Sequence, residues 1–274
     1  MKESKFLVRT ISGAVVLLIM IVAIVLGGPV LTGTLTTLSL LGLFEFYKVN
    51  RCHASVPAFA GYLGCAALFL ITGTERYQMT SSVIVAVVIV VLILYVIRFG
   101  KVDSEQVAMI LFGFLYVPLL FSFVLRLRLM DNGIYYVWLV FTGAWGSDTC
   151  AYLVGTALGR HKITPVLSPK KSVEGCIGGV LGAAFVSFLY ALYAKNLMVA
   201  RFDVLIVFPI IGAITSVVAQ FGDLAASAIK RNNDIKDFSN LIPGHGGILD
   251  RFDSIIVAAP IVYVLCKLFQ IAVI

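Results

Sequence analysis

The chain has 274 residues, of which 60% are hydrophobic and 13% are charged, and its formal net charge is +7. Its mean hydropathy of +1.03 excludes an ordinary soluble domain, because the surface of a soluble protein is charged where a lipid-facing surface is apolar. The composition predicts an all-α, polytopic integral membrane protein.

Nine apolar runs follow one another along the chain. A helix of about 20 residues crosses the hydrocarbon core of a bilayer, so each run predicts one transmembrane helix. The predicted spans are 10–28, 29–47, 54–74, 77–97, 106–125, 134–157, 174–194, 202–226 and 254–274. Little chain is left over, so we expect any polar site to be built from helix ends and two longer loops, 158–173 and 227–253.

Lysine and arginine are distributed unevenly between alternate loops. Fifteen of the 21 lie in segments that would be cytoplasmic if the N-terminus is inside, and five lie in the opposite segments. Cytoplasmic loops carry an excess of basic residues, so we expect a cytoplasmic N-terminus and an external C-terminus. Both longer loops then open to the cytoplasm, in a multi-pass protein of the cell's inner (cytoplasmic) membrane.

A single acid, Glu45, lies near the cytoplasmic end of the second predicted span. Two interpretations are equally compatible with this position. The side chain either lines the same cavity as the other polar residues or snorkels to the membrane interface.

The sixth predicted span contains GAWGSDTCAYLVG, which places Asp148 in an otherwise apolar helix. An acid inside a span needs a partner and marks a candidate functional site. Tyr152, four residues further on, shares its helix face, and Gly143 and Gly146 permit another helix to approach closely. The alternative is a structural hydrogen bond between helices.

Lys170 and Lys171 lie side by side in the loop before the seventh predicted span. Ser168 and Pro169 predict a turn followed by a helix start. Lysines beside the free N–H groups of a helix N-terminus form an anion site, whereas the helix dipole makes capping an unsuitable role for them. Each lysine alone is also compatible with a simple positive-inside anchor.

The eighth span ends with Asp223, Ser227 and Lys230, which share one helix face if the helix continues. Asp250 and Asp253 follow at i and i+3 as the ninth span begins. Like charges at this spacing repel unless a cation bridges them, so the acids favour a metal site. Carboxylates suit Mg²⁺ and ammonium groups suit phosphate, so the segment predicts a site for both.

Between these acids lies the Pro243–Gly247 turn, with the sequence PGHGG. Its glycines allow the backbone to pack against a ligand. His245 is interpreted as a turn or phosphate contact in preference to a general base. The chain has three histidines and no HExxH spacing, which argues against zinc, and the absence of a P-loop or GxGxxG pattern argues against an ATP-driven pump.

Residues 227–254, SAIKRNNDIKDFSNLIPGHGGILDRFDS, resemble the signature of the phosphatidate cytidylyltransferase (CDP-diacylglycerol synthase) family, and every fixed position of that signature is filled. Residues 168–175 and 146–155 also resemble family blocks. The resemblance covers the C-terminal half, whereas residues 1–130 agree only in being hydrophobic and multi-spanning. The chain contains no repeat, low-complexity tract or linker, so we treat 1–274 as a single integral membrane domain, in which 134–274 is expected to supply the catalytic helices and cytoplasmic loops.

The resemblance implies Mg²⁺-dependent nucleotidyl transfer, in which CTP and phosphatidate yield CDP-diacylglycerol and pyrophosphate for phospholipid biosynthesis. Asp223 and Asp250 are expected to hold a metal pair, or Mg²⁺ with a second cation, and Asp148 and Asp253 to complete or orient the shell. Expected catalytic residues are Asp148, Asp223, Asp250, Lys171 and Lys230. Expected substrate-binding residues are Lys170, Lys171, Ser227, Lys230, Arg231, His245, Gly246, Gly247 and Arg251. The expected partners are CTP, phosphatidate and membrane lipids, with no nucleic acid, and family members suggest a homodimer.

Two other classes of function remain open. A CTP-dependent polyprenol or dolichol kinase, or a cytidylyltransferase for an ether lipid, would keep the fold and change the lipid or the transferred group. A cation-coupled transporter would instead use Asp148 and Asp223 to bind ions. The acids cluster with lysines at helix ends rather than at the midplane, which favours the enzyme.

Overall fold

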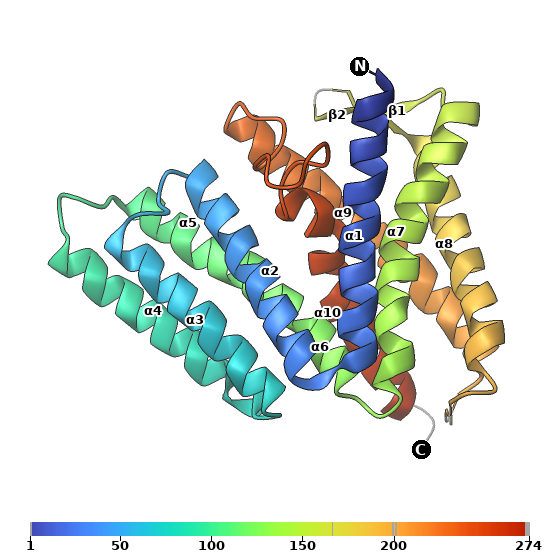
Figure 1. The fold of residues 1–274 in the computed structure, drawn as a ribbon, viewed down its shortest axis with the longest axis horizontal. Helices are drawn as coiled ribbons and strands as arrows, with labels where there is room; N and C mark the ends of the chain where they lie inside the picture. The colour runs from blue at the N-terminus through green and yellow to red at the C-terminus, as the bar shows by residue number, and fades with distance from the viewer. Residues whose placement is uncertain (1, 166, 199, 201, 272–274) are drawn as a thin grey trace. The chain divides into compact units, whose positions relative to one another are not determined.

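The computed structural model describes residues 2–165, 167–198, 200 and 202–271, and these residues are predominantly helical (Figure 1). They divide into two compact units. The first unit takes in the chain up to residue 125 together with 235–252, and the second takes in 126–234 together with 253–274. The segment 235–252 therefore returns to pack with the N-terminal helices.

The first unit is built from apolar helices joined by short turns. Its helices are α1 (Lys2–Leu26), α2 (Gly28–Val49), α3 (Val56–Gly73), the short η1 (Tyr77–Met79), α4 (Thr80–Ile97) and α5 (Ser104–Phe114). Figure 1 shows α3 and α4 running side by side, in agreement with their packing contacts. A π-helical turn, η2 (Leu115–Leu119), contains Pro118 and joins α5 to α6 (Leu120–Arg128). Proline has no N–H to donate, and the wider π-helical turn accommodates it, so the helical segment continues from α5 into α6.

The second unit is centred on α7 (Gly133–Leu158), α8 (Val173–Ala194) and α9 (Val204–Asn232), which pack against one another. A Cβ added to Gly143 of α7 would lie 2.5 Å from the Cγ2 atom of Thr215 on α9. The glycine therefore allows the two helices to approach closely, as predicted from the sequence. The last helix, α10 (Leu249–Ile271), begins in the first unit and continues in the second.

A two-stranded hairpin precedes α8. Strands β1 (Lys162–Thr164) and β2 (Ser168–Ser172) pair antiparallel. The prediction that a helix starts at Pro169 is wrong, because Pro169 lies in β2 and α8 begins only at Val173. The Ser172 hydroxyl accepts a hydrogen bond from the Gly175 N–H at 3.2 Å, so it caps α8 and sets the start of the helix.

In the part of the chain that the structure describes, each of the nine predicted spans falls on helix over most of its length, which confirms the all-α class apart from the hairpin. Residues 272–274 of the ninth span lie outside the described part of the chain. Within the described residues, seven helices are long and apolar enough to cross a membrane. They do not include α7, and Thr10–Leu26 of α1 forms a shorter apolar helix. A total of nine spans and the orientation of the termini stay predictions. The ninth span starts earlier than predicted, since α10 begins at Leu249 rather than 254.

Candidate functional site

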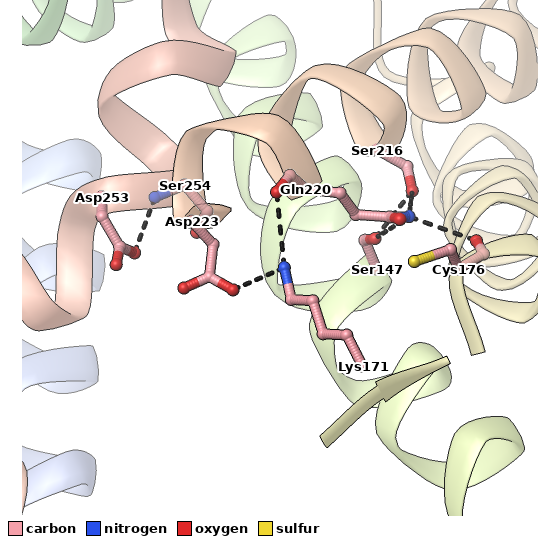
Figure 2. A network of polar contacts seen from close by, with 8 residues as sticks. All are labelled: Ser147, Lys171, Cys176, Ser216, Gln220, Asp223, Asp253 and Ser254. Atoms are coloured by element: carbon pink, nitrogen blue, oxygen red, sulfur yellow. Dashed lines mark hydrogen bonds and ion pairs between the residues drawn. The ribbon is translucent and has the colours of Figure 1, made fainter. Parts of the chain in front are cut away.

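Two residues from separate sequence motifs form an ion pair in the second unit. Lys171, on β2, places its Nζ atom 2.6 Å from Asp223 Oδ2 on α9, and the same ammonium donates to the Gln220 carbonyl at 3.3 Å (Figure 2). The side chains of Lys171 and Asp223 are 21% and 31% exposed, respectively. Both charges are therefore accessible to a ligand, and the fold brings together a predicted phosphate contact and a predicted metal ligand.

Asp253 extends this cluster. Its side chain is buried, and its Oδ1 atom accepts a hydrogen bond from the Ser254 N–H at 2.8 Å. Asp148, Asp223 and Lys230 all interact electrostatically with Asp253. The second unit thus brings the charges of Asp148, Asp223 and Lys230 within electrostatic range of Asp253, and Lys171 joins them through its ion pair with Asp223.

A small residue lets α9 approach α10 at this cluster. A Cβ added to Gly222, the residue before Asp223, would lie 3.1 Å from the Asp253 carbonyl oxygen and from Val257. The close approach brings the α9 face that carries Asp223 and Lys230 next to the helix that carries Asp253. The predicted continuation of α9 through Lys230 is confirmed, because the helix extends to Asn232.

The donor set suits a hard cation that is shared with a phosphate ligand. Among the described residues, no group of three or more His, Cys, Asp or Glu side chains is arranged to hold a metal ion by itself. Mg²⁺, however, commonly binds one or two carboxylates and completes its shell with waters and substrate phosphates. Asp148, Asp223 and Asp253 supply oxygen donors of this type, so the residues fit Mg²⁺ bound together with a phosphate.

A buried polar network, which the sequence reasoning missed, connects α8 with α7 and α9, the helices that carry Asp148 and Asp223. Gln220 Nε2 on α9 donates to Ser147 Oγ on α7 and to the Cys176 carbonyl on α8, each at 3.2 Å, and Ser216 Oγ donates to Ser147 Oγ at 2.7 Å (Figure 2). Ser147 directly precedes Asp148, so the network fixes the α7 backbone beside it. The signal in the sequence was the i, i+4 spacing of Ser216 and Gln220 within an apolar span.

Asp250 organises the polar loop of the first unit. Its Oδ2 atom accepts hydrogen bonds from the N–H groups of Phe238 at 2.8 Å and of Gly247 at 2.9 Å. Gly246 has φ +84°, and a Cβ there would lie 2.8 Å from the same oxygen. The loop therefore wraps around the carboxyl group, and a glycine is needed where it does so. The metal role of Asp250 stays a prediction.

The turn at His245 is held by the N-terminal helix. Ser12 Oγ, on α1, lies 2.8 Å from His245 Nδ1 and donates to the Pro243 carbonyl at 3.0 Å. The imidazole thus packs as part of the turn. Glu45 is buried and accepts hydrogen bonds from the same loop, so the interpretation of it as an acid that snorkels to the membrane interface is wrong.

Comparison with known proteins assigns the chain to a family. The profile of the Cytidylyltransferase family matches residues 7–269. The chain belongs to this family. It is 30% identical to the phosphatidate cytidylyltransferase of Bacillus subtilis (strain 168), with 96% of this chain and 98% of the relative covered. The enzymes of the same name from Staphylococcus saprophyticus and Staphylococcus aureus (strain COL) are 30% and 31% identical, with 94% of this chain and 98% of each relative covered.

The remaining candidate residues of this cytidylyltransferase lie at helix ends and in the polar segments. Lys170 is exposed on β2, Arg231 is exposed in the last turn of α9, and Arg251 is exposed in the first turn of α10. Ser227 is partly buried on α9, and Lys230 is buried. The family match also reaches α1 and α2, which the sequence motifs did not cover.

Proposed function

We propose that this chain is a phosphatidate cytidylyltransferase, which converts CTP and phosphatidate to CDP-diacylglycerol and pyrophosphate for phospholipid biosynthesis. Relatives of that name at about 30% identity over nearly the whole chain support the assignment. The observation that carries it is the juxtaposition of Lys171 with Asp223, because the reaction needs a phosphate contact beside a cation ligand.

The main obstacle to the reaction is electrostatic. A phosphate oxygen of the lipid attacks the α-phosphorus of CTP, the bond to the β-phosphate oxygen breaks, and pyrophosphate leaves. Both reactants are anions, so their approach requires nearby positive charge. Lys170, Lys171, Lys230 and Arg231 would supply that charge from β2 and the end of α9. A phosphomonoester is largely ionised near neutral pH, so the attacking oxygen needs no strong general base.

We propose Asp223 and Asp250 as ligands of Mg²⁺, alone or with a second cation, and Asp148 and Asp253 as residues that complete or orient the shell. When bound, Mg²⁺ would neutralise phosphate charge and polarise the reacting phosphoryl group. The support differs between the acids. Asp223, Asp148 and Asp253 interact within the second unit, whereas Asp250 rests on the sequence signature.

The existing ion pair suits an exchange of partners. Lys171 and Asp223 neutralise each other in the structure described here. A phosphate that binds Lys171 together with a cation that binds Asp223 would replace that pair, so neither side chain would be left with an uncompensated charge. Partial exposure of both groups makes this exchange accessible from outside the fold.

Transfer of label from CTP tests the proposed reaction. Protein purified in micelles that contain phosphatidate, its ether-linked analogue or a polyprenol is supplied with Mg²⁺ and CTP labelled in either the α- or the γ-phosphate. We expect the α-label in the lipid and the γ-label in pyrophosphate. Transfer of the γ-label to a polyprenol would instead identify a lipid kinase, and a preference for an ether lipid would change the substrate. No CTP turnover with any of these lipids would favour a transporter.

A further inference from the structure

Glu45 makes three hydrogen bonds to a loop about 200 residues further along the chain. Its Oε1 atom accepts from Ser239 Oγ at 2.6 Å and from the Ile248 N–H at 3.0 Å, and its Oε2 atom accepts from the Leu249 N–H at 2.9 Å. The side chain is only 3% exposed. Both oxygens of this buried group are thus engaged by one segment of the first unit.

These contacts place Glu45 at the start of α10. The first N–H groups of a helix have no partner within it, and they favour a negative charge. Glu45 accepts from the N–H groups of Ile248 and Leu249, and Asp250 accepts from that of Gly247. Two carboxyl groups, one on α2 and one on α10 itself, therefore share three consecutive N–H groups and set where the helix begins.

The approach of the loop to Glu45 leaves no room for a side chain. A Cβ added to Gly247 would lie 2.5 Å from Glu45 Oε2 and 2.6 Å from Oε1. The second glycine of the His-Gly-Gly sequence is therefore explained by packing against α2. The N-terminal half of the chain thus fixes the backbone of the segment that carries the family-like signature.

We propose that Glu45 is a positioning residue, which holds the Pro243–Gly247 turn and the first turn of α10 in the geometry that places Asp250 and Arg251 for turnover. The side chain acts through the loop and not by contact with substrate. The part of this inference that concerns turnover rests on the proposed function. The part that concerns loop order stands on the hydrogen bonds alone.

Glu45→Gln keeps the size and shape of the side chain but removes its negative charge and one of its two oxygen acceptors. The amide keeps one oxygen acceptor but presents an NH₂ group to backbone donors, so at least one N–H of the loop loses its partner. Glu105→Gln makes the same chemical change at an exposed position in the first turn of α5 and serves as the matched control. Glu45→Asp keeps the carboxylate on a shorter side chain.

Hydrogen exchange and steady-state kinetics are measured on full-length wild type and on each variant in the same micelles. For Glu45→Gln we expect faster amide exchange confined to residues 239–250, and a loss of about 10-fold to 100-fold in kcat/KM for CTP per folded molecule. Glu45→Asp should recover part of both, and Glu105→Gln should match wild type. A purely structural role would instead lower the yield of folded protein and leave kcat/KM per folded molecule unchanged.

Each outcome decides one part of the inference. If wild type turns over CTP and Glu45→Gln matches it in both exchange and kcat/KM, the inference is overturned. If wild type shows no turnover, the proposed function fails, and the exchange of residues 239–250 alone decides whether Glu45 orders the loop. If Glu45→Gln does not fold, Ser239→Ala removes a single donor and should shift exchange and kcat/KM in the same direction by a smaller factor. Wild-type behaviour of that variant would then reject the proposal.

Discussion

The Asp223 carboxylate forms an ion pair with Lys171, and it is also proposed to bind a metal ion. The ion pair is partly exposed, so its contribution to stability is about 1 kcal/mol or less. We therefore expect Asp223→Asn to fold with a melting temperature close to that of wild type. If the carboxylate binds Mg²⁺, pyrophosphate release should fall by at least about 100-fold, because a neutral amide is a poor ligand for that ion.

Asp131→Asn is the matched control, because Asp131 is exposed in the turn before α7. It should leave both the rate and the melting temperature unchanged. An Asp223→Asn variant with near wild-type turnover would show that Lys171 and Asp223 form only a structural pair. Raising the Mg²⁺ concentration gives a second readout, since a weakened metal site shifts the Mg²⁺ dependence of the rate and a misfolded protein does not respond.

At the scale of elements, the Ser147–Ser216–Gln220 network joins α7, α8 and α9. Gln220→Met keeps a similar volume but removes the donor to Ser147 Oγ and the Cys176 carbonyl. Ser147 Oγ keeps the hydrogen bond from Ser216, so the loss of the two donations from Gln220 should cost about 1 kcal/mol. We expect a lower unfolding midpoint in micelles, with Gln78→Met as the control at an exposed site in η1. An unchanged midpoint would mean that the helices are held by close packing at glycines such as Gly143.

The elements that could be predicted from sequence are those set by the membrane. A long apolar run must satisfy its backbone internally, so helix is the outcome wherever such a run occurs. The hairpin could not be predicted in the same way, because β1 and β2 are short, polar and interrupted by Pro169. Helix ends also depended on distant groups. The start of α10 at Leu249 follows from Glu45, whose acceptor role has no local sequence signal.

The individual residues of the candidate site could be predicted from sequence, but their pairings could not, because the partners are distant in the chain. Charged residues in an apolar chain are conspicuous, so Asp148, Asp223 and Asp253 could be selected from sequence alone, and Asp148 and Asp223 both interact electrostatically with Asp253 in the second unit. Pairings between distant segments could not be selected. The contact of Lys171 with Asp223 requires the hairpin, and the contact of Ser12 with His245 requires α1 to pack on the loop.

At the scale of the whole molecule, the predicted count of nine spans and the orientation of the site both depend on whether α7 crosses the membrane. The seven described helices that are long and apolar enough to cross do not include Gly133–Leu158, the helix that carries Ser147 and Asp148. The distribution of basic residues nevertheless predicts that its two ends lie on opposite sides, with the β1–β2 hairpin in the cytoplasm. Ser147 is buried and bonded to Ser216 and Gln220 of α9, which makes such a crossing feasible at that position, because polar groups in a span are tolerated when other helices cover them, whereas Asp148 beside it is exposed.

Asp131→Cys and Lys162→Cys test this crossing, each in an active variant with the five native cysteines replaced by alanine. Both positions are exposed, one before α7 and one in the hairpin after it. A membrane-impermeant thiol reagent should label position 162 in inside-out vesicles and position 131 in right-side-out vesicles. Reversed labelling would reject the proposed orientation, because it would place the hairpin outside the cell, where Lys171 could not reach cytoplasmic CTP. Labelling of both from one side would show that α7 does not cross, and the count of nine spans would then be wrong.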